Sequence, residues 1–88
     1  MKVLKFGADW CSQCKAMDNE LKEHPLIIET DFIDVDDAND SILEKYQIRS
    51  IPIIIVLDDS NIEIKRWIGR TSPNEINQFL EKYERKES

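Results

Sequence analysis

The feature that most restricts the fold of this chain is an uninterrupted apolar run, Ile53 to Leu57, in which four of the five residues are β-branched. Pro52 precedes the run and Asp58-Asp59 follows it, so turn-forming residues stand at both ends. A strand with one face in water alternates polar and apolar residues, whereas a strand covered on both faces does not. The run therefore predicts a central strand in an α/β fold whose helices cover both faces of the sheet.

The other elements follow from hydrophobic periodicity and turn residues, in the order strand, helix, strand, helix, strand, strand, helix. A β-α-β start implies parallel pairing with a right-handed crossover, and the last two strands form a hairpin, which gives a mixed four-stranded sheet. No linker or repeat divides the chain, so we expect a single domain over residues 1–88. The expected strands are 3–6, 31–36, 53–57 and 62–68, and the expected helices begin at Cys11, at Asn39 or Asp40, and at Ser72.

Apolar residues at helical spacing predict the buried side of each helix. In the second strand we expect Phe32, Ile33 and Val35 to supply the buried side chains. The alternation of the last strand breaks near Trp67, which indicates a bulge or a strand end there. The expected inward stripes are Cys14, Met17 and Leu21 on the first helix, Ile42, Leu43 and Tyr46 on the second, and Ile76, Phe79, Leu80 and Tyr83 on the last.

Cys11 and Cys14 are the only cysteines, and three positions separate them. Residues three apart on a helix are neighbours, so the two sulfurs can close into a disulfide without large backbone movement. If Cys11 lies at the helix N-terminus, the unpaired N–H groups and the helix dipole lower the pKa of its thiol. We therefore expect Cys11 to be the exposed nucleophile and Cys14, one turn further in, to be the shielded thiol that resolves a mixed disulfide.

A zinc site is the main alternative use of the two cysteines. A structural zinc site needs four ligands, and only His24 stands near enough in the sequence to join them. The ligand count fails without dimerisation, so we predict no metal and no cofactor.

The charge and length of the chain limit its partners and its location. The formal net charge is -6, which argues against nucleic acid or an anionic membrane as a partner. Six acidic residues and no basic residue lie between Glu29 and Asp40, and we interpret this acidic stretch as a solvated edge and loop rather than a docking surface for a basic partner. No apolar run is long enough to span a membrane or to form a signal peptide, so we expect a soluble, cytoplasmic monomer.

The segment Ala8-Asp9-Trp10-Cys11-Ser12-Gln13-Cys14-Lys15 resembles the thioredoxin family's Ala-x-Trp-Cys-Gly-Pro-Cys-Lys. Ile48-Arg49-Ser50-Ile51-Pro52 is similar to that family's Ile-Arg-(Gly/Ser)-Ile-Pro, and Asp36 and Gly69 fall at matching places. The resemblance covers nearly the whole chain and implies a thioredoxin-like fold. It also implies a thiol-disulfide oxidoreductase that reduces protein disulfides, with Cys11 and Cys14 as its catalytic residues.

The resemblance implies further roles, residue by residue. Pro52 matches a cis-proline that lies opposite the cysteines, and the backbone of Ile51 would pair with an extended substrate segment. Trp10 and Gly69 would help form the apolar docking surface. Ser12-Gln13 replaces Gly-Pro between the cysteines and should alter the redox potential. A thioredoxin reductase or another electron donor would regenerate the dithiol.

Two departures from the family concern proton transfer. The family has a buried Asp six residues before the first cysteine, which assists proton transfer to the second, and Lys5 stands there in this chain. The family's lysine partner of that Asp aligns with Phe32. A solvent water or a nearby carboxylate such as Asp9 would have to serve instead.

Two other functions fit a chain of this kind. A glutaredoxin-like protein would take its electrons from glutathione, although such a protein normally has Tyr where Gln13 stands. A thioredoxin-fold binding subunit would use the fold as a scaffold, with the acidic stretch as its contact and with no redox role.

Overall fold

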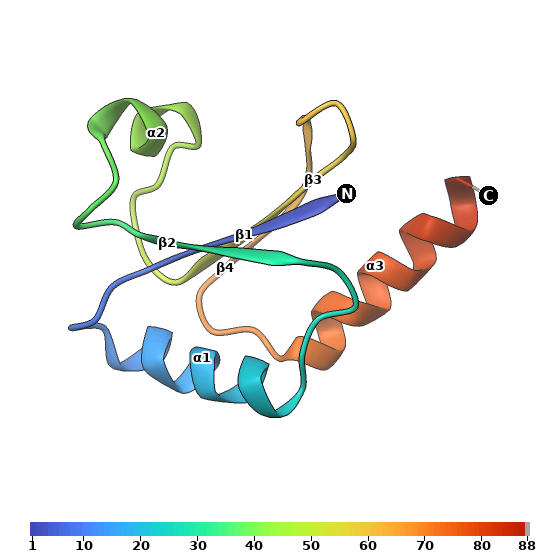
Figure 1. Cartoon of the computed structure of the whole chain (residues 1–88), viewed down its shortest axis with the longest axis horizontal. Coiled ribbons are helices and arrows are strands. Elements are labelled where there is room, and N and C mark those ends of the chain that lie inside the picture. Colours follow the sequence, from blue (N-terminus) through green and yellow to red (C-terminus); the bar gives the residue numbers. More distant parts are fainter. Residues whose placement is uncertain (88) are drawn as a thin grey trace.

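The central strand predicted from the apolar run is present in the computed structural model, which describes residues 1–87, as β3 (Ile53–Leu57). The predicted order of elements is confirmed (Figure 1). Ser88, which the expected domain range includes, lies outside the described residues. The other elements are β1 (Lys2–Gly7), α1 (Ser12–Glu23), β2 (Thr30–Asp34), α2 (Asp40–Lys45), β4 (Glu63–Ile68) and α3 (Pro73–Glu87).

The four strands form one mixed sheet in the order β2-β1-β3-β4. β1 pairs parallel with β2 and β3 pairs antiparallel with β4, as the sequence predicts. β1 also pairs antiparallel with β3, a pairing that the sequence did not predict. All five residues of β3 are at most 2% exposed. An uninterrupted β-branched run suits this position, because β3 has a strand on each side and helices over both faces.

One face of the sheet carries α1 and α3, and the opposite face carries α2 (Figure 1). Successive residues of a strand point to opposite faces, so Val3 packs toward α1 and α3 whereas Leu4 packs toward α2. The predicted inward stripes of the helices are confirmed except at Tyr83 of α3, which is partly exposed and stacks on Phe79. The buried residues on the α1 and α3 side are Val3, Met17, Leu21, Ile54, Val56, Ile76 and Leu80, and those on the α2 side are Leu4, Phe6, Ile53, Ile55 and Leu57, against which Ile42, Leu43 and Tyr46 pack.

Side-chain caps fix where the second and third helices begin. Asn39 Oδ1 accepts a hydrogen bond from the backbone N–H of Ile42 at 3.0 Å. Ser72 Oγ accepts one from the N–H of Glu75 at 3.2 Å. Each cap satisfies a backbone donor that has no partner within its helix.

The prediction that Phe32 is buried is wrong, since its side chain is 59% exposed. β2 lies at the edge of the sheet and spans 30–34 rather than 31–36, because Asp34 Oδ1 accepts the N–H of Asp36 at 2.8 Å and turns the chain. Phe32 lies opposite Lys5 in the β1–β2 register, on the α1 side. Ile33 and Val35 are partly buried and pack against the α2 side, as expected.

Of the two explanations for the break near Trp67, the strand end is confirmed, since β4 ends at Ile68, and the bulge is wrong. Trp67 pairs in register with Ile54, and the register shift falls between Val56 and Leu57, at the hairpin end of the ladder. The alternation breaks because Ile68 is an exposed apolar residue on an edge strand, 69% exposed, and not because of a bulge.

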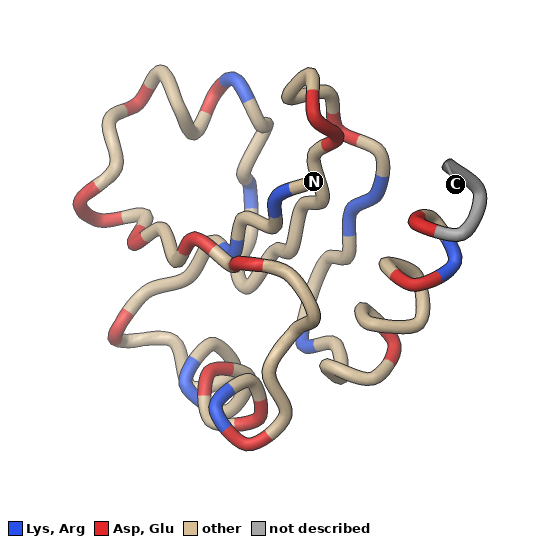
Figure 2. Tube along the Cα trace, turned by 45° about the vertical axis from the view of Figure 1, so that its right-hand side comes forward, with Lys and Arg blue, Asp and Glu red and all other residues tan. Residues whose placement is uncertain are grey.

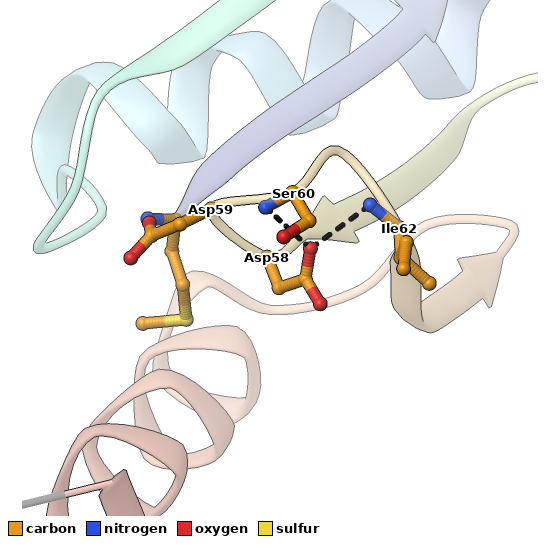
Figure 3. A network of polar contacts seen from close by, with 5 residues as sticks. Asp58, Asp59, Ser60 and Ile62 are labelled. Atoms are coloured by element: carbon orange, nitrogen blue, oxygen red, sulfur yellow. Dashed lines mark hydrogen bonds and ion pairs between the residues drawn. The ribbon is translucent and has the colours of Figure 1, made fainter.

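A carboxylate organises the β3–β4 hairpin turn. Asp58 Oδ1 accepts hydrogen bonds from the N–H groups of Ser60 at 2.8 Å and Ile62 at 3.0 Å, as Figure 3 shows. Asn61 adopts a positive φ of 64° within this turn. Asp and Asn favour such turns, because their side chains bond to nearby backbone and Asn tolerates left-handed backbone. Among residues 1–87, the structure contains no helix that is both long enough and apolar enough to cross a membrane.

Candidate active site

The two cysteines lie where β1 ends and α1 begins, at the left edge of Figure 1. Cys11 is the N-cap of α1, with φ −93° and ψ 110°, and its Sγ accepts a hydrogen bond from the N–H of Cys14 at 3.2 Å. The N–H of Cys11 in turn donates to the carbonyl oxygen of Ala8 at 3.2 Å. The sulfur of Cys11 therefore occupies the position that a capping oxygen takes in other helices, facing unpaired backbone donors.

The two thiols differ in acidity. The hydrogen bond from the Cys14 thiol lowers the pKa of Cys11, and the backbone N–H groups of Cys14 and Gln13 act in the same direction. Cys14 is only 1% exposed, and burial, together with its hydrogen bond to Cys11, raises its pKa to about 11. Both are free thiols in this structure. Cys11 is therefore the thiol that ionises first, and Cys14 is the shielded one.

Trp10 lies beside Cys11 and is held in an exposed position. Its side chain is 69% exposed, and its Nε1–H donates to Asp36 Oδ2 at 2.8 Å. The sequence singles out Asp36 only by resemblance. In the structure, its carboxylate holds the Trp10 ring by this hydrogen bond. The ring borders a shallow groove whose other lining residues are Val35, Leu43, Ile48, Arg49, Ser50 and Ile51.

The Ile51–Pro52 peptide bond is cis, as the resemblance implies. The N–H of Gly69 donates to the carbonyl oxygen of Pro52 at 2.9 Å, which brings the loop before β3 and the end of β4 together. Gly69 has φ +94°, a left-handed conformation that suits glycine because it has no Cβ. The structure thus places Ile51 in the groove beside Trp10 and joins Pro52 to Gly69.

Ser12 and Gln13 form the start of α1, and both are exposed. The backbone of Gln13 contributes to the lowered pKa of Cys11. Their expected influence on the redox potential stays a prediction.

An ion pair between a buried lysine and a partly exposed aspartate lies next to the cysteines. The Lys5 side chain is 3% exposed, and its Nζ lies 2.5 Å from Asp18 Oδ1 on α1. Sequence reasoning noticed that Lys5 replaces an acid but missed Asp18 as its partner. The available signal was spacing, because Asp18 follows Cys14 by four residues and so lies on the same face of the helix.

Comparisons with known proteins agree with this geometry. A family model described as Thioredoxin matches residues 1–82. The thioredoxin of Mycoplasmoides gallisepticum is 37% identical over 82 residues, which cover 89% of this chain and 79% of that protein. The mitochondrial thioredoxin of Bos taurus is 26% identical over 85 residues, 91% of this chain but only 49% of that longer protein. The solved structure of thioredoxin 1 from Thermosipho africanus aligns with a TM-score of 0.73 at 33% identity, covering 94% of this chain and 93% of that one.

Proposed function

The chain belongs to the thioredoxin family of thiol-disulfide oxidoreductases, and from that premise we propose that it reduces protein disulfides through a Cys11-Ser12-Gln13-Cys14 dithiol cycle. The observation that carries the proposal is the unequal pair of thiols at the start of α1. One sulfur caps the helix and has a lowered pKa, and the other is buried one turn further in.

The cycle has two exchange steps. The Cys11 thiolate attacks one sulfur of a substrate disulfide, the substrate S–S bond breaks, and the released substrate thiolate takes a proton from solvent. Cys14 then loses its proton and attacks Cys11 Sγ, which forms the Cys11–Cys14 bond and releases the second substrate thiol. Two electrons pass from the protein to the substrate in one turn of the cycle.

The groove beside Trp10 is the proposed docking surface. The backbone of Ile51 pairs with an extended substrate segment, while Trp10 and the junction of Pro52 with Gly69 supply apolar contact. Main-chain pairing gives affinity with little sequence preference, which suits a protein that acts on many disulfides.

A thioredoxin reductase, or another dithiol or flavin-linked donor, returns two electrons to the Cys11–Cys14 disulfide. We place the protein in the cytoplasm as a monomer, where a reducing environment keeps both cysteines as thiols between turnovers.

An insulin-reduction assay tests the proposal, with dithiothreitol as the electron donor. The wild-type protein should accelerate the reduction, Cys11→Ser should be inactive, and Cys14→Ser should accumulate a mixed disulfide. Ser60→Ala, in the β3–β4 turn, is the matched control and should behave as wild type. Reduction that survives loss of Cys11 would refute the Cys11 cycle, and a wild-type protein that does not accelerate the reduction would favour a binding subunit.

The electron donor is tested separately with the oxidised protein. Reduction by NADPH and thioredoxin reductase supports the proposal. Reduction by glutathione alone, with no response to the reductase, would contradict it and favour a glutaredoxin-like function.

A further inference from the structure

Lys5 is a buried lysine on the α1 side of β1, 2% exposed as a whole residue. Its Nζ contacts Asp18 Oδ1 at 2.5 Å and donates a hydrogen bond to the carbonyl oxygen of Cys14 at 3.4 Å. A charge taken out of water is stable only when it is paired and hydrogen-bonded, and these two contacts meet that need. The ammonium is thereby fixed between β1 and the first turns of α1.

Gly7 brings this ammonium and the Cys14 sulfur into one small space. A Cβ placed on Gly7 would lie 3.0 Å from Lys5 Nζ and 3.2 Å from Cys14 Sγ. The two groups therefore border the same point next to Gly7, and Gly7 contributes no side chain to the space between them. A cation in this position acts directly on any charge that forms on Cys14.

We propose that the Lys5 ammonium, held in place by Asp18, stabilises the Cys14 thiolate in the step that resolves the mixed disulfide. The inference rests on the proposed function and assigns a residue to its second step. Cys14 gives its proton to solvent, and the thiolate attacks Cys11 Sγ. The Cys11–substrate S–S bond breaks as the Cys11–Cys14 bond forms, and the departing substrate thiolate takes a proton from solvent.

Lys5 lines a small cleft between α1 and the strands β1 and β2, and the charges around this cleft single out Lys5 for the role. The charged side chains that line it are Lys5 of β1, Asp9 of the β1–α1 turn, Lys15 and Asp18 of α1, and Asp34 of β2. Asp9, Lys15, Asp18 and Asp34 are exposed or partly exposed, so water screens their charges more than that of Lys5, which is buried. Burial and the hydrogen bond to Cys11 raise the pKa of Cys14 to about 11, whereas a hydrogen bond from the backbone of Ala8 and the charge of Lys5 lower it.

The first test measures the pKa of Cys14 without requiring activity. In a Cys11→Ser background, Cys14 is the only thiol, and the ultraviolet absorbance of its thiolate gives its titration. Lys5→Met keeps an unbranched side chain of similar size and removes the charge. We expect the pKa of Cys14 to rise by about one unit, equivalent to roughly tenfold less thiolate at neutral pH. Lys15→Met, on the same cleft but exposed, should leave that pKa unchanged.

The second test follows the two exchange steps with a chromogenic aromatic disulfide, which releases one coloured thiol at capture and a second at resolution. Lys5→Met should slow the second release about tenfold at neutral pH and shift its pH profile to higher pH, while the first release changes little. Lys15→Met should release both thiols at the wild-type rates. Equal pKa values of Cys14 and equal second-release rates in wild type and Lys5→Met would overturn the inference.

Gly7→Ala covers the case in which Lys5→Met does not fold. Its Cβ would lie 3.0 Å from Lys5 Nζ and also 3.2 and 3.3 Å from Cys14 Sγ and Cβ. The flexible end of Lys5 gives way more easily than the Cys14 side chain on its helix, and all charges remain, so the pKa of Cys14 should again rise. An unchanged pKa would reject the role of Lys5. Because the titration needs no substrate, a failed insulin assay would refute the proposed function without deciding this point.

Discussion

Alkylation of the two thiols offers a quantitative test of their difference. With a pKa of about 11, Cys14 is a thiolate in roughly one molecule in ten thousand at pH 7. Cys11 has a pKa below its ordinary value of 9.0, so more than about one molecule in a hundred is ionised. The ratio of thiolates is therefore at least about a hundredfold. A less basic thiolate is a weaker nucleophile, and a Brønsted slope of about 0.4–0.5 over these two units removes roughly tenfold of that advantage.

Ionisation alone thus predicts at least about a tenfold preference of iodoacetamide for Cys11, and the 1% exposure of Cys14 adds to it. Mass spectrometry of singly modified protein after a short pulse at pH 7 measures the ratio. In denaturant the preference should vanish, because both thiols then titrate as free cysteines. Comparable labelling of Cys14 in the folded protein would refute the assignment of the two roles. As the pH rises, labelling of Cys14 should increase about tenfold per unit and level off near its pKa.

Three further outcomes follow from contacts in the structure. Leu80→Ala, at a side chain with 0% exposure, should lower the free energy of unfolding in urea by about 2–5 kcal/mol, whereas Gln78→Ala on the exposed side of α3 should change it by less than about 0.5 kcal/mol. Asn39→Ala removes the cap of α2 and should cost about 1 kcal/mol in the same measurement. Trp10→Phe keeps an aromatic ring but loses the hydrogen bond to Asp36, so KM for insulin should rise by less than about tenfold while kcat stays near wild type; an unchanged KM would contradict a docking role for this ring.

The order of elements and the sheet were predictable because each depends on local pattern. The apolar run of β3 and the Ser72-Pro73 start of α3 each indicate one structure with little ambiguity, whereas the sequence left the cap of α2 open between Asn39 and Asp40, and the structure shows Asn39. Phe32 was misjudged because a short edge strand follows the same apolar pattern as a covered one. Which side of β2 is covered depends on how far α1 reaches across the sheet, and no local pattern records that distance.

The candidate site, like the fold, was predictable from the sequence only in part. The position of Cys11 at the N-terminus of a helix follows from sequence spacing, and the cis bond before Pro52 came from resemblance alone. The pairing of Lys5 with Asp18 joins a strand to a helix across the interior, and neither the spacing argument nor the resemblance predicted it. The pattern of charges along the sequence does not show which acidic residue contacts the site. Figure 2 shows acidic positions recurring along β2 and the following loop to α2, yet only the structure links one of them, Asp36, to Trp10.

The arrangement implies that the two exchange steps are tuned by different parts of the chain. Cys11 owes its lowered pKa chiefly to the Cys14 thiol and to backbone N–H groups at the start of α1, with the charge of Lys5 as the smallest contribution, so changes at Ser12 and Gln13 should act mainly on capture. Cys14 lies against β1, where burial and the charge of Lys5 oppose each other, so changes at Lys5 should act mainly on resolution. A carboxylate at that position would repel the Cys14 thiolate and could help only by taking its proton. An ammonium stabilises the thiolate itself, and it can do so without accepting a proton.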